Sequence, residues 1–154
     1  MTLDNVDAVR GPTASQAAGL TLGAAKAIMK AAMAEGRAMR VALSVAVVDS
    51  GGQLVAFERM DGADLVTITL AQDKAWTALV NRMPTRDLAP LVQPGAEFFG
   101  YESVGRGRTI VFAGGMPLLR DGVLVGGVGV SGGNFEFDER VAREAVESIG
   151  ANAR

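Results

Sequence analysis

Cysteine and histidine are both absent from this chain of 154 residues. Without cysteine the protein has no disulfide, no thiolate ligand for a metal and no cysteine nucleophile. Without histidine it lacks the Ser-His-Asp triad, the commonest ligand of transition metals and the usual proton shuttle near neutral pH. Any catalysis must therefore use carboxylates, lysine, arginine, tyrosine or the backbone.

Strong charge and long apolar runs are also missing. The net charge is -2 and the basic residues do not cluster, so we expect neither nucleic acid nor membrane as a partner. No apolar run reaches the length of a membrane span, and residues 1–19 lack the features of a secretory signal, which predicts a cytoplasmic protein. No spacing of carboxylates suggests a metal cage, so no metal site is predicted.

Hydrophobic residues make up 49% of the chain, which is enough for one well-packed core at this length. We therefore expect a single domain over residues 20–154. Residues 1–19 are polar and contain Gly11-Pro12, which predicts a flexible N-terminal arm that becomes ordered only against a partner.

Apolar periodicity and turn residues divide the domain into helices and strands. The expected elements are helices at residues 21–37, 65–82 and after a capping Asp138, and strands at residues 41–48, 53–60, 109–113 and 123–131. Tight turns at residues 49–52 and 121–122 imply antiparallel pairing of the strands that they join. The order predicts an α+β fold, an antiparallel sheet flanked by helices.

The last predicted strand contains unusually many glycines. Gly127, Gly129 and Ser131 alternate onto one face, whereas Leu124, Val128 and Val130 should face the core. Glycine inside a strand commonly marks close contact with a ligand or another backbone. The bare face is therefore either the floor of a ligand pocket or a surface for backbone contact between chains.

Several blocks of the sequence, in this order and spacing, resemble the family of GlcG and HbpS proteins, which includes the C-terminal part of PduO-type corrinoid proteins. The blocks are VAVVDSGG at residues 45–52, RMDGA at 59–63, AQDKAWTA at 71–78, PT at 84–85, GGMPL at 114–118 and GGVGVSGG at 126–133. The resemblance implies a profilin-like fold and homo-oligomers. It also implies one of several functions, because relatives include haem-binding sensors, corrinoid-associated proteins and lyases acting on hydroxylaminobenzoate.

Haem is a possible cofactor on this resemblance, but the best axial ligand is missing from a chain without histidine. Tyr101, a methionine such as Met60, or packing alone would have to hold it. No cofactor is therefore assigned from the sequence.

Two candidate groups lie in the first half of the chain. Arg59 and Asp61 are two residues apart at a strand end, where they would either hold the following loop or bind a carboxylate group of a ligand. Lys74 lies among small residues of the second helix. It is either an ordinary surface lysine or, if buried near the glycine strand, a group of lowered pKa that could act as acid or base.

Residues 93–108 have no regular period and hold a third group. Phe98 and Phe99 either bury themselves or form the wall of a pocket for a flat ligand. Glu97 and Tyr101 are then candidates for proton transfer, and the remaining cations could bind an acidic group, namely Arg106 and Arg108.

Three hypotheses follow. The first is a protein that binds a small flat or acidic organic molecule, of the haem or corrinoid type or an aromatic acid, between the glycine strand, the second helix and residues 93–108. The second is a cofactor-independent lyase that releases ammonia from a hydroxylaminobenzoate-type acid, with Lys74, Glu97 and Tyr101 as catalytic candidates. The third is a structural subunit of an oligomer without a ligand.

Overall fold

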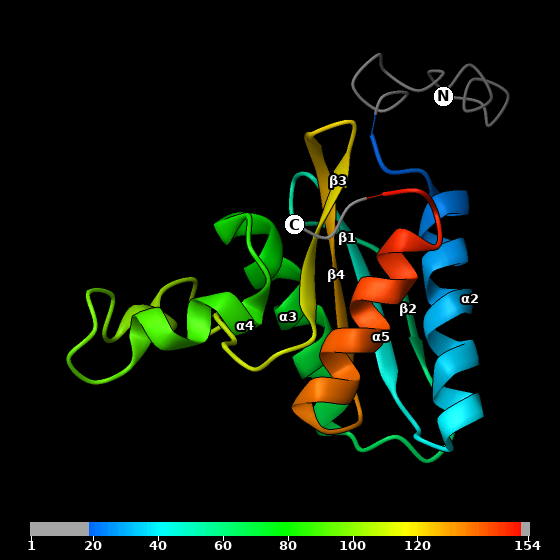
Figure 1. The fold of residues 1–154 in the computed structure, drawn as a ribbon, viewed down its shortest axis with the longest axis horizontal. Coiled ribbons are helices and arrows are strands. Elements are labelled where there is room, and N and C mark those ends of the chain that lie inside the picture. Colours follow the sequence, from blue (N-terminus) through cyan, green and yellow to red (C-terminus); the bar gives the residue numbers. More distant parts are fainter. Residues whose placement is uncertain (1–18, 152–154) are drawn as a thin grey trace, which may run out of the picture.

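A computed structural model describes residues 19–151 and contains one antiparallel sheet of four strands in the order β2-β1-β4-β3 (Figure 1). The elements follow the chain as α2 (Leu22–Met39), β1 (Ser44–Asp49), β2 (Leu54–Arg59), α3 (Val66–Asn81), α4 (Thr85–Leu88), two short 3-10 turns η2 (Ala89–Val92) and η3 (Tyr101–Ser103), β3 (Gly115–Arg120), β4 (Val123–Ser131) and α5 (Phe135–Glu147). The predicted α+β class with a profilin-like antiparallel sheet is confirmed. The expected N-terminal arm lies outside the described residues, apart from its last residue.

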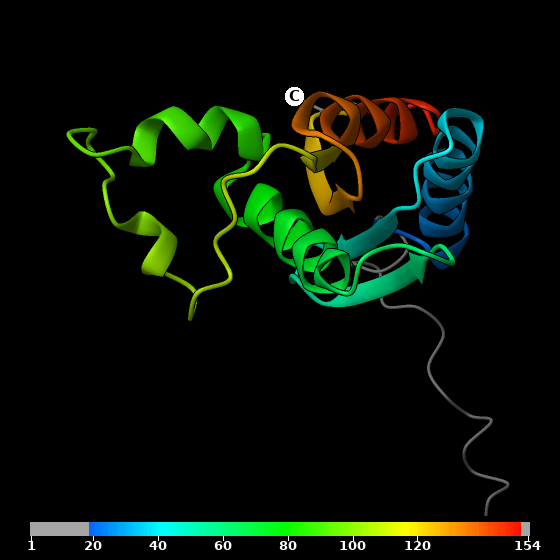
Figure 2. The same ribbon diagram turned by 90° about the horizontal axis from the view of Figure 1, so that it is seen from below.

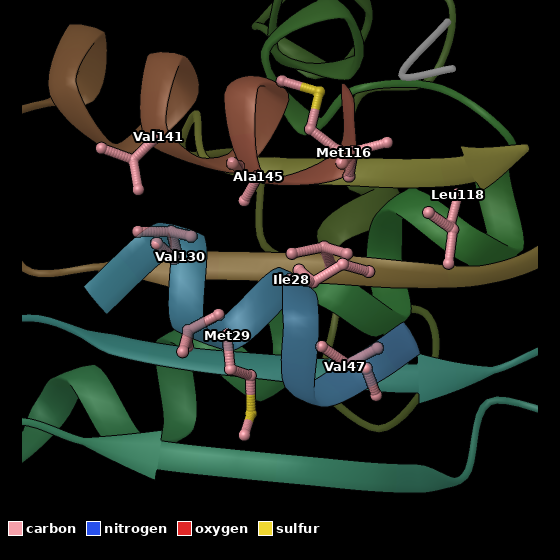
Figure 3. Close-up of a cluster of buried hydrophobic side chains, with 14 of the residues drawn as sticks. Ile28, Met29, Val47, Met116, Leu118, Val130, Val141 and Ala145 are labelled. Atoms are coloured by element: carbon pink, nitrogen blue, oxygen red, sulfur yellow. The ribbon is translucent and has the colours of Figure 1, made fainter. Parts of the chain in front are cut away.

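The larger core lies between the sheet and the pair of helices α2 and α5 (Figure 2). Side chains of both helices meet residues of β1, β3 and β4 there, among them Ile28, Val47, Met116, Val130 and Val141 (Figure 3). All five are fully buried. Burying such side chains contributes roughly 1.5–3 kcal/mol each, so this core supplies most of the driving force for folding.

Helix α3 covers the opposite face of the sheet, where the core is thin and made mainly of alanine (Figure 2). A β-carbon on Gly129 would collide with the carbonyl oxygen of Ala71, and one on Gly127 with that of Ala75. The helix backbone therefore lies directly on the glycine strand. Larger side chains on that face of β4 would force the helix away.

Three local expectations are wrong. The strand expected at residues 109–113 begins instead at Gly115, and its Pro117 lies on an edge strand, where the missing N–H is tolerated. Leu124 packs on the α3 side because a bulge shifts the register between Leu118 and Leu119. The cap of α5 is Asn134, whose side chain accepts a hydrogen bond from the backbone N–H of residue 137, and not Asp138.

Residues 85–112, here called the arm, project to one side of the molecule, beyond α3 (Figures 1 and 2). The arm contains α4, η2 and η3 and otherwise turns and irregular backbone, as expected for residues 93–108. It carries several large apolar side chains on its surface, so it is the part of the described chain with the clearest potential for contacts to other molecules.

Candidate functional site

Lys74 is almost fully buried, at 1% exposure, and forms an ion pair with Asp138 of α5. Its Nζ lies 2.9 Å from Asp138 Oδ2 and donates a second hydrogen bond of 2.9 Å to the carbonyl oxygen of Val130. Asp138 Oδ1 accepts a hydrogen bond from the backbone N–H of Gly133. The pair therefore connects α3, α5 and the end of β4 inside the protein.

Burial changes the proton affinity of both partners of this pair. Loss of hydration lowers the pKa of Lys74, and the attraction of Asp138 only partly offsets that change. Loss of hydration likewise raises the pKa of Asp138, against the opposing effect of Lys74. The buried alternative for Lys74 is thus confirmed, whereas a catalytic role for it stays a prediction.

The surroundings of Lys74 are closely packed. A β-carbon on Gly114 would lie 3.1 Å from Lys74 Nζ, and one on Gly115 would lie 2.5 Å from the Lys74 carbonyl oxygen. Thr85 Oγ1 accepts a hydrogen bond from the backbone N–H of Gly115 and donates one to the carbonyl oxygen of Phe112. Gly114 and Gly115 therefore pack against Lys74, and Thr85 fixes Gly115 in that position.

The proposed ligand floor on β4 does not exist. Gly127 and Gly129 are covered by the backbone of α3, and Ser131 is buried at 4% exposure. The expectation of a pocket over these residues is wrong, because alternation along a strand shows which positions share a face but not what packs on that face.

A hollow of about 280 Å³ lies instead between the end of α3 and the arm. We call it the arm hollow; its lining residues are Asn81, Met83, Leu88, Leu91, Phe98 and Tyr101. The Tyr101 hydroxyl donates a hydrogen bond of 2.8 Å to Asn81 Oδ1. This bond holds the phenol ring in the lining of the hollow. Two of the predicted residues, Phe98 and Tyr101, are therefore brought together in a largely apolar concave site.

The other candidates on the arm lie outside this hollow. Glu97, Phe99 and Arg106 are exposed. Arg108 forms an ion pair of 3.0 Å with Asp73 and lies 4.8 Å from the ring centre of Trp76, so it fastens the arm to α3.

Arg59 and Asp61 lie away from the arm. They line a separate hollow together with Met60 and with two residues of α2, Met33 and Arg37. Both are exposed, and no ion pair joins them.

The three catalytic candidates do not meet at one place. Lys74 is enclosed beside Asp138, Glu97 is on the arm surface and Tyr101 is in the arm hollow. A lyase would need its acid, its base and its carboxylate-binding cation around one substrate. The described residues provide no such cluster.

Sequence reasoning missed most of the arm hollow. Four of its lining residues were not among the predicted site residues, namely Asn81, Met83, Leu88 and Leu91. Proline at residues 84 and 90, which breaks up the backbone between α3 and the arm, was the one available signal.

By its fold, the protein belongs to the α+β class, with a four-stranded antiparallel sheet that is covered by helices on both faces (Figure 2). The family model described as "Haem degrading protein HbpS-like" matches residues 20–147, so the chain belongs to the HbpS-like family, as the sequence blocks predicted. In residues 19–151, no helix combines the length and the apolar character needed to cross a membrane.

Curated relatives lie between 35% and 40% identity. The corrinoid adenosyltransferase PduO of Salmonella typhimurium is 40% identical over 79% of this chain, which spans only 36% of the length of PduO. A 15.0 kDa protein from the dhaT-dhaS intergenic region of Citrobacter freundii is 36% identical over 86% of this chain and 93% of its own length. GlcG of Escherichia coli is 35% identical over 70% of this chain and 77% of its own length.

Solved structures show the same fold. PduOC in complex with haem matches with a TM-score of 0.85 and 37% identity, covering 88% of this chain and 99% of PduOC. HbpS matches with a TM-score of 0.77 and 33% identity, covering 90% of this chain and 96% of HbpS.

Proposed function

We propose that this protein binds a flat, largely apolar small molecule in the arm hollow, and that haem is the first compound to test. The observation that carries the proposal is the haem complex of PduOC, whose structure matches this chain with a TM-score of 0.85. The aromatic and aliphatic lining of the arm hollow supports it independently, because ligand sites are typically concave and mostly apolar.

The size and shape of the hollow favour a flat ligand that is inserted by one edge. Its volume of about 280 Å³ is near the lower end of the range for small-molecule sites. The rings of Phe98 and Tyr101 lie 6.3 Å apart and tilted by 55°, so they form two walls of different orientation. A ligand larger than one ring would extend over the neighbouring arm surface.

Two lining residues fit a haem group by their chemistry. Tyr101 and Met83 carry an oxygen and a sulfur atom of the kinds that ligate haem iron in proteins. The Tyr101 hydroxyl uses its proton toward Asn81, which leaves oxygen lone pairs available. Met60, the methionine considered from the sequence, lines the other hollow with Arg59. When bound, haem would supply a redox-active iron.

Titration with haem and with iron-free protoporphyrin separates ring binding from iron ligation. We expect both to bind, and we expect a shifted Soret band for haem. Tyr101→Phe should change the haem spectrum while leaving the protoporphyrin affinity within about twofold, because only the iron needs the oxygen. Met60→Leu is the matched control and should change neither.

A second variant tests the location. Leu91→Asp places a charge in the apolar wall and should weaken both ligands about tenfold or more, since burying an unpaired charge is costly. Leu22→Asp makes the same change at an exposed position on α2 and should have no effect. Absence of binding by both porphyrins, or equal effects of the two variants, would overturn the proposal.

A further inference from the structure

A hollow of about 380 Å³ lies where the C-terminal part of α2 meets the end of β2. We call it the Arg59 hollow; its lining residues are Met33, Arg37, Glu58, Arg59, Met60 and Asp61. Helix α2 and strand β2 lie side by side, so residues of both elements reach this one hollow (Figure 1). It shares no lining residue with the arm hollow.

The most buried lining residues are two methionines. Met33 is only 4% exposed, and a β-carbon on Gly36 would lie 2.9 Å from Met60 Sδ, so the thioether of Met60 packs directly on α2. The backbone of Met60 is held as well, because its N–H donates to the carbonyl oxygen of Leu43 and its carbonyl oxygen accepts from the N–H of Ala63. Methionine side chains adapt to irregular apolar shapes. The hollow therefore has an apolar part that is fixed in place.

Four charged side chains lie around these methionines, two of each sign. Arg37 and Arg59 carry the positive charges, and Glu58 and Asp61 carry the negative ones. All four are exposed, and none of them forms an ion pair with another residue of the described chain. Since exposed charges gain little from pairing with one another, these groups are available to a ligand.

The balance of charge decides which class of ligand fits. A simple carboxylate would be attracted by the two guanidinium groups but repelled by Glu58 and Asp61, and a simple amine would meet the opposite conflict. A ligand with a carboxylate and an ammonium group on one carbon atom can satisfy both kinds of side chain. Guanidinium groups bind a carboxylate through two hydrogen bonds, and carboxylates accept hydrogen bonds from ammonium.

We propose that the Arg59 hollow binds a free amino acid with an apolar side chain. Arg37 and Arg59 bind its carboxylate. Glu58 and Asp61 accept hydrogen bonds from its ammonium group, and the two methionines contact its side chain. This zwitterion differs from the acid expected for Arg59 from the sequence, because charges of both signs are required. The site does not depend on the arm hollow or on porphyrin binding.

Nuclear magnetic resonance titration of the isotope-labelled full chain with leucine tests the ligand and its location together. The backbone amide signals of residues 58–61 should shift as leucine is added. Leucinamide lacks the carboxylate and 4-methylpentanoate lacks the ammonium group, so each should bind about tenfold or more weakly than leucine. Glycine, which has no side chain to reach the methionines, should also bind more weakly.

Two variants test the charged groups separately. Arg59→Gln should weaken leucine about tenfold or more and reduce its advantage over leucinamide. Arg120→Gln is the matched control, because Arg120 ends β3 as Arg59 ends β2, at the opposite edge of the sheet. Asp61→Asn should weaken leucine but not 4-methylpentanoate, since only leucine has an ammonium group for this carboxylate.

The outcomes also separate this site from the arm hollow. Arg59→Gln should leave porphyrin binding unchanged, and Leu91→Asp should leave leucine binding unchanged, so either site can fail alone. The proposal would be overturned if millimolar leucine did not shift the signals of residues 58–61, or if 4-methylpentanoate bound as tightly as leucine. Equal leucine binding by the Arg59→Gln and Arg120→Gln variants would overturn it too.

Discussion

At the scale of single residues, the feature with the greatest consequence is the buried pair of Lys74 and Asp138. Both side chains are at most 3% exposed, and each also hydrogen-bonds a backbone group. Removing two charges from water is costly, and only good geometry and complete hydrogen bonding offset that cost. The stability of the fold therefore depends on both residues of the pair, independently of any ligand.

Lys74→Met should lower the free energy of unfolding by about 3–5 kcal/mol, because it leaves the Asp138 carboxylate buried without a partner. The double variant Lys74→Met/Asp138→Asn should recover most of that loss, since the asparagine oxygen can still accept from Gly133. Urea unfolding of the three proteins measures both effects. A single variant as stable as the wild type would show that the pair is not a structural requirement.

At the scale of elements, the contact between α3 and β4 determines how the molecule packs. The glycines of β4 let the helix backbone approach the sheet more closely than side chains would allow. The same contact fills the face that was expected to hold a ligand. Binding is therefore expected on the arm side of α3 and not between α3 and the sheet.

Gly129→Ala should lower the free energy of unfolding by about 3 kcal/mol or more, because the added methyl group collides with the backbone of α3 and not with a flexible side chain. Gly23→Ala is the control, since its β-carbon meets only Thr21 Oγ1, at 3.9 Å, and alanine favours the helix by up to about 1 kcal/mol. Thermal and urea unfolding compare the two. If Gly129→Ala left the free energy of unfolding unchanged, α3 would be able to move away from β4 at no cost.

At the scale of the whole molecule, the arm projects to one side (Figure 1). It carries apolar side chains on its surface. Phe99 is 63% exposed and Val104 is 49% exposed. Exposed apolar side chains gathered on one segment are typical of association surfaces. The homo-oligomer expected from the family resemblance remains a prediction. If it forms, we expect copies of the chain to meet at the arm.

Analytical ultracentrifugation should find the wild-type protein in a species larger than one chain. The double variant Phe99→Asp/Val104→Asp should shift it toward smaller species, because charges in an apolar contact are costly to bury. Leu22→Asp, on α2, should not shift it. A wild-type protein that sediments as a monomer at every concentration would contradict the assembly.

Much of the fold could be predicted because its signals are local. The turn at Asp121-Gly122, where both residues adopt positive φ, and the adjoining strand β4 follow directly from residue type and alternation. The start of α2 follows likewise from the Thr21 cap. Most of the arm hollow could not be predicted: Phe98 and Tyr101 stood out as aromatic residues, whereas no local pattern marked Leu88 or Leu91 as lining residues.

The sequence by itself determined the class of fold, the family and the absence of histidine and cysteine chemistry, since these depend on composition and on patterns between near neighbours. Only the tertiary structure decided that Lys74 faces Asp138, 64 positions away, and that α3 covers the glycines of β4. Periodicity identifies which side chains share a face. The partner of that face is chosen by packing between elements far apart in the chain, which leaves no mark on local spacing.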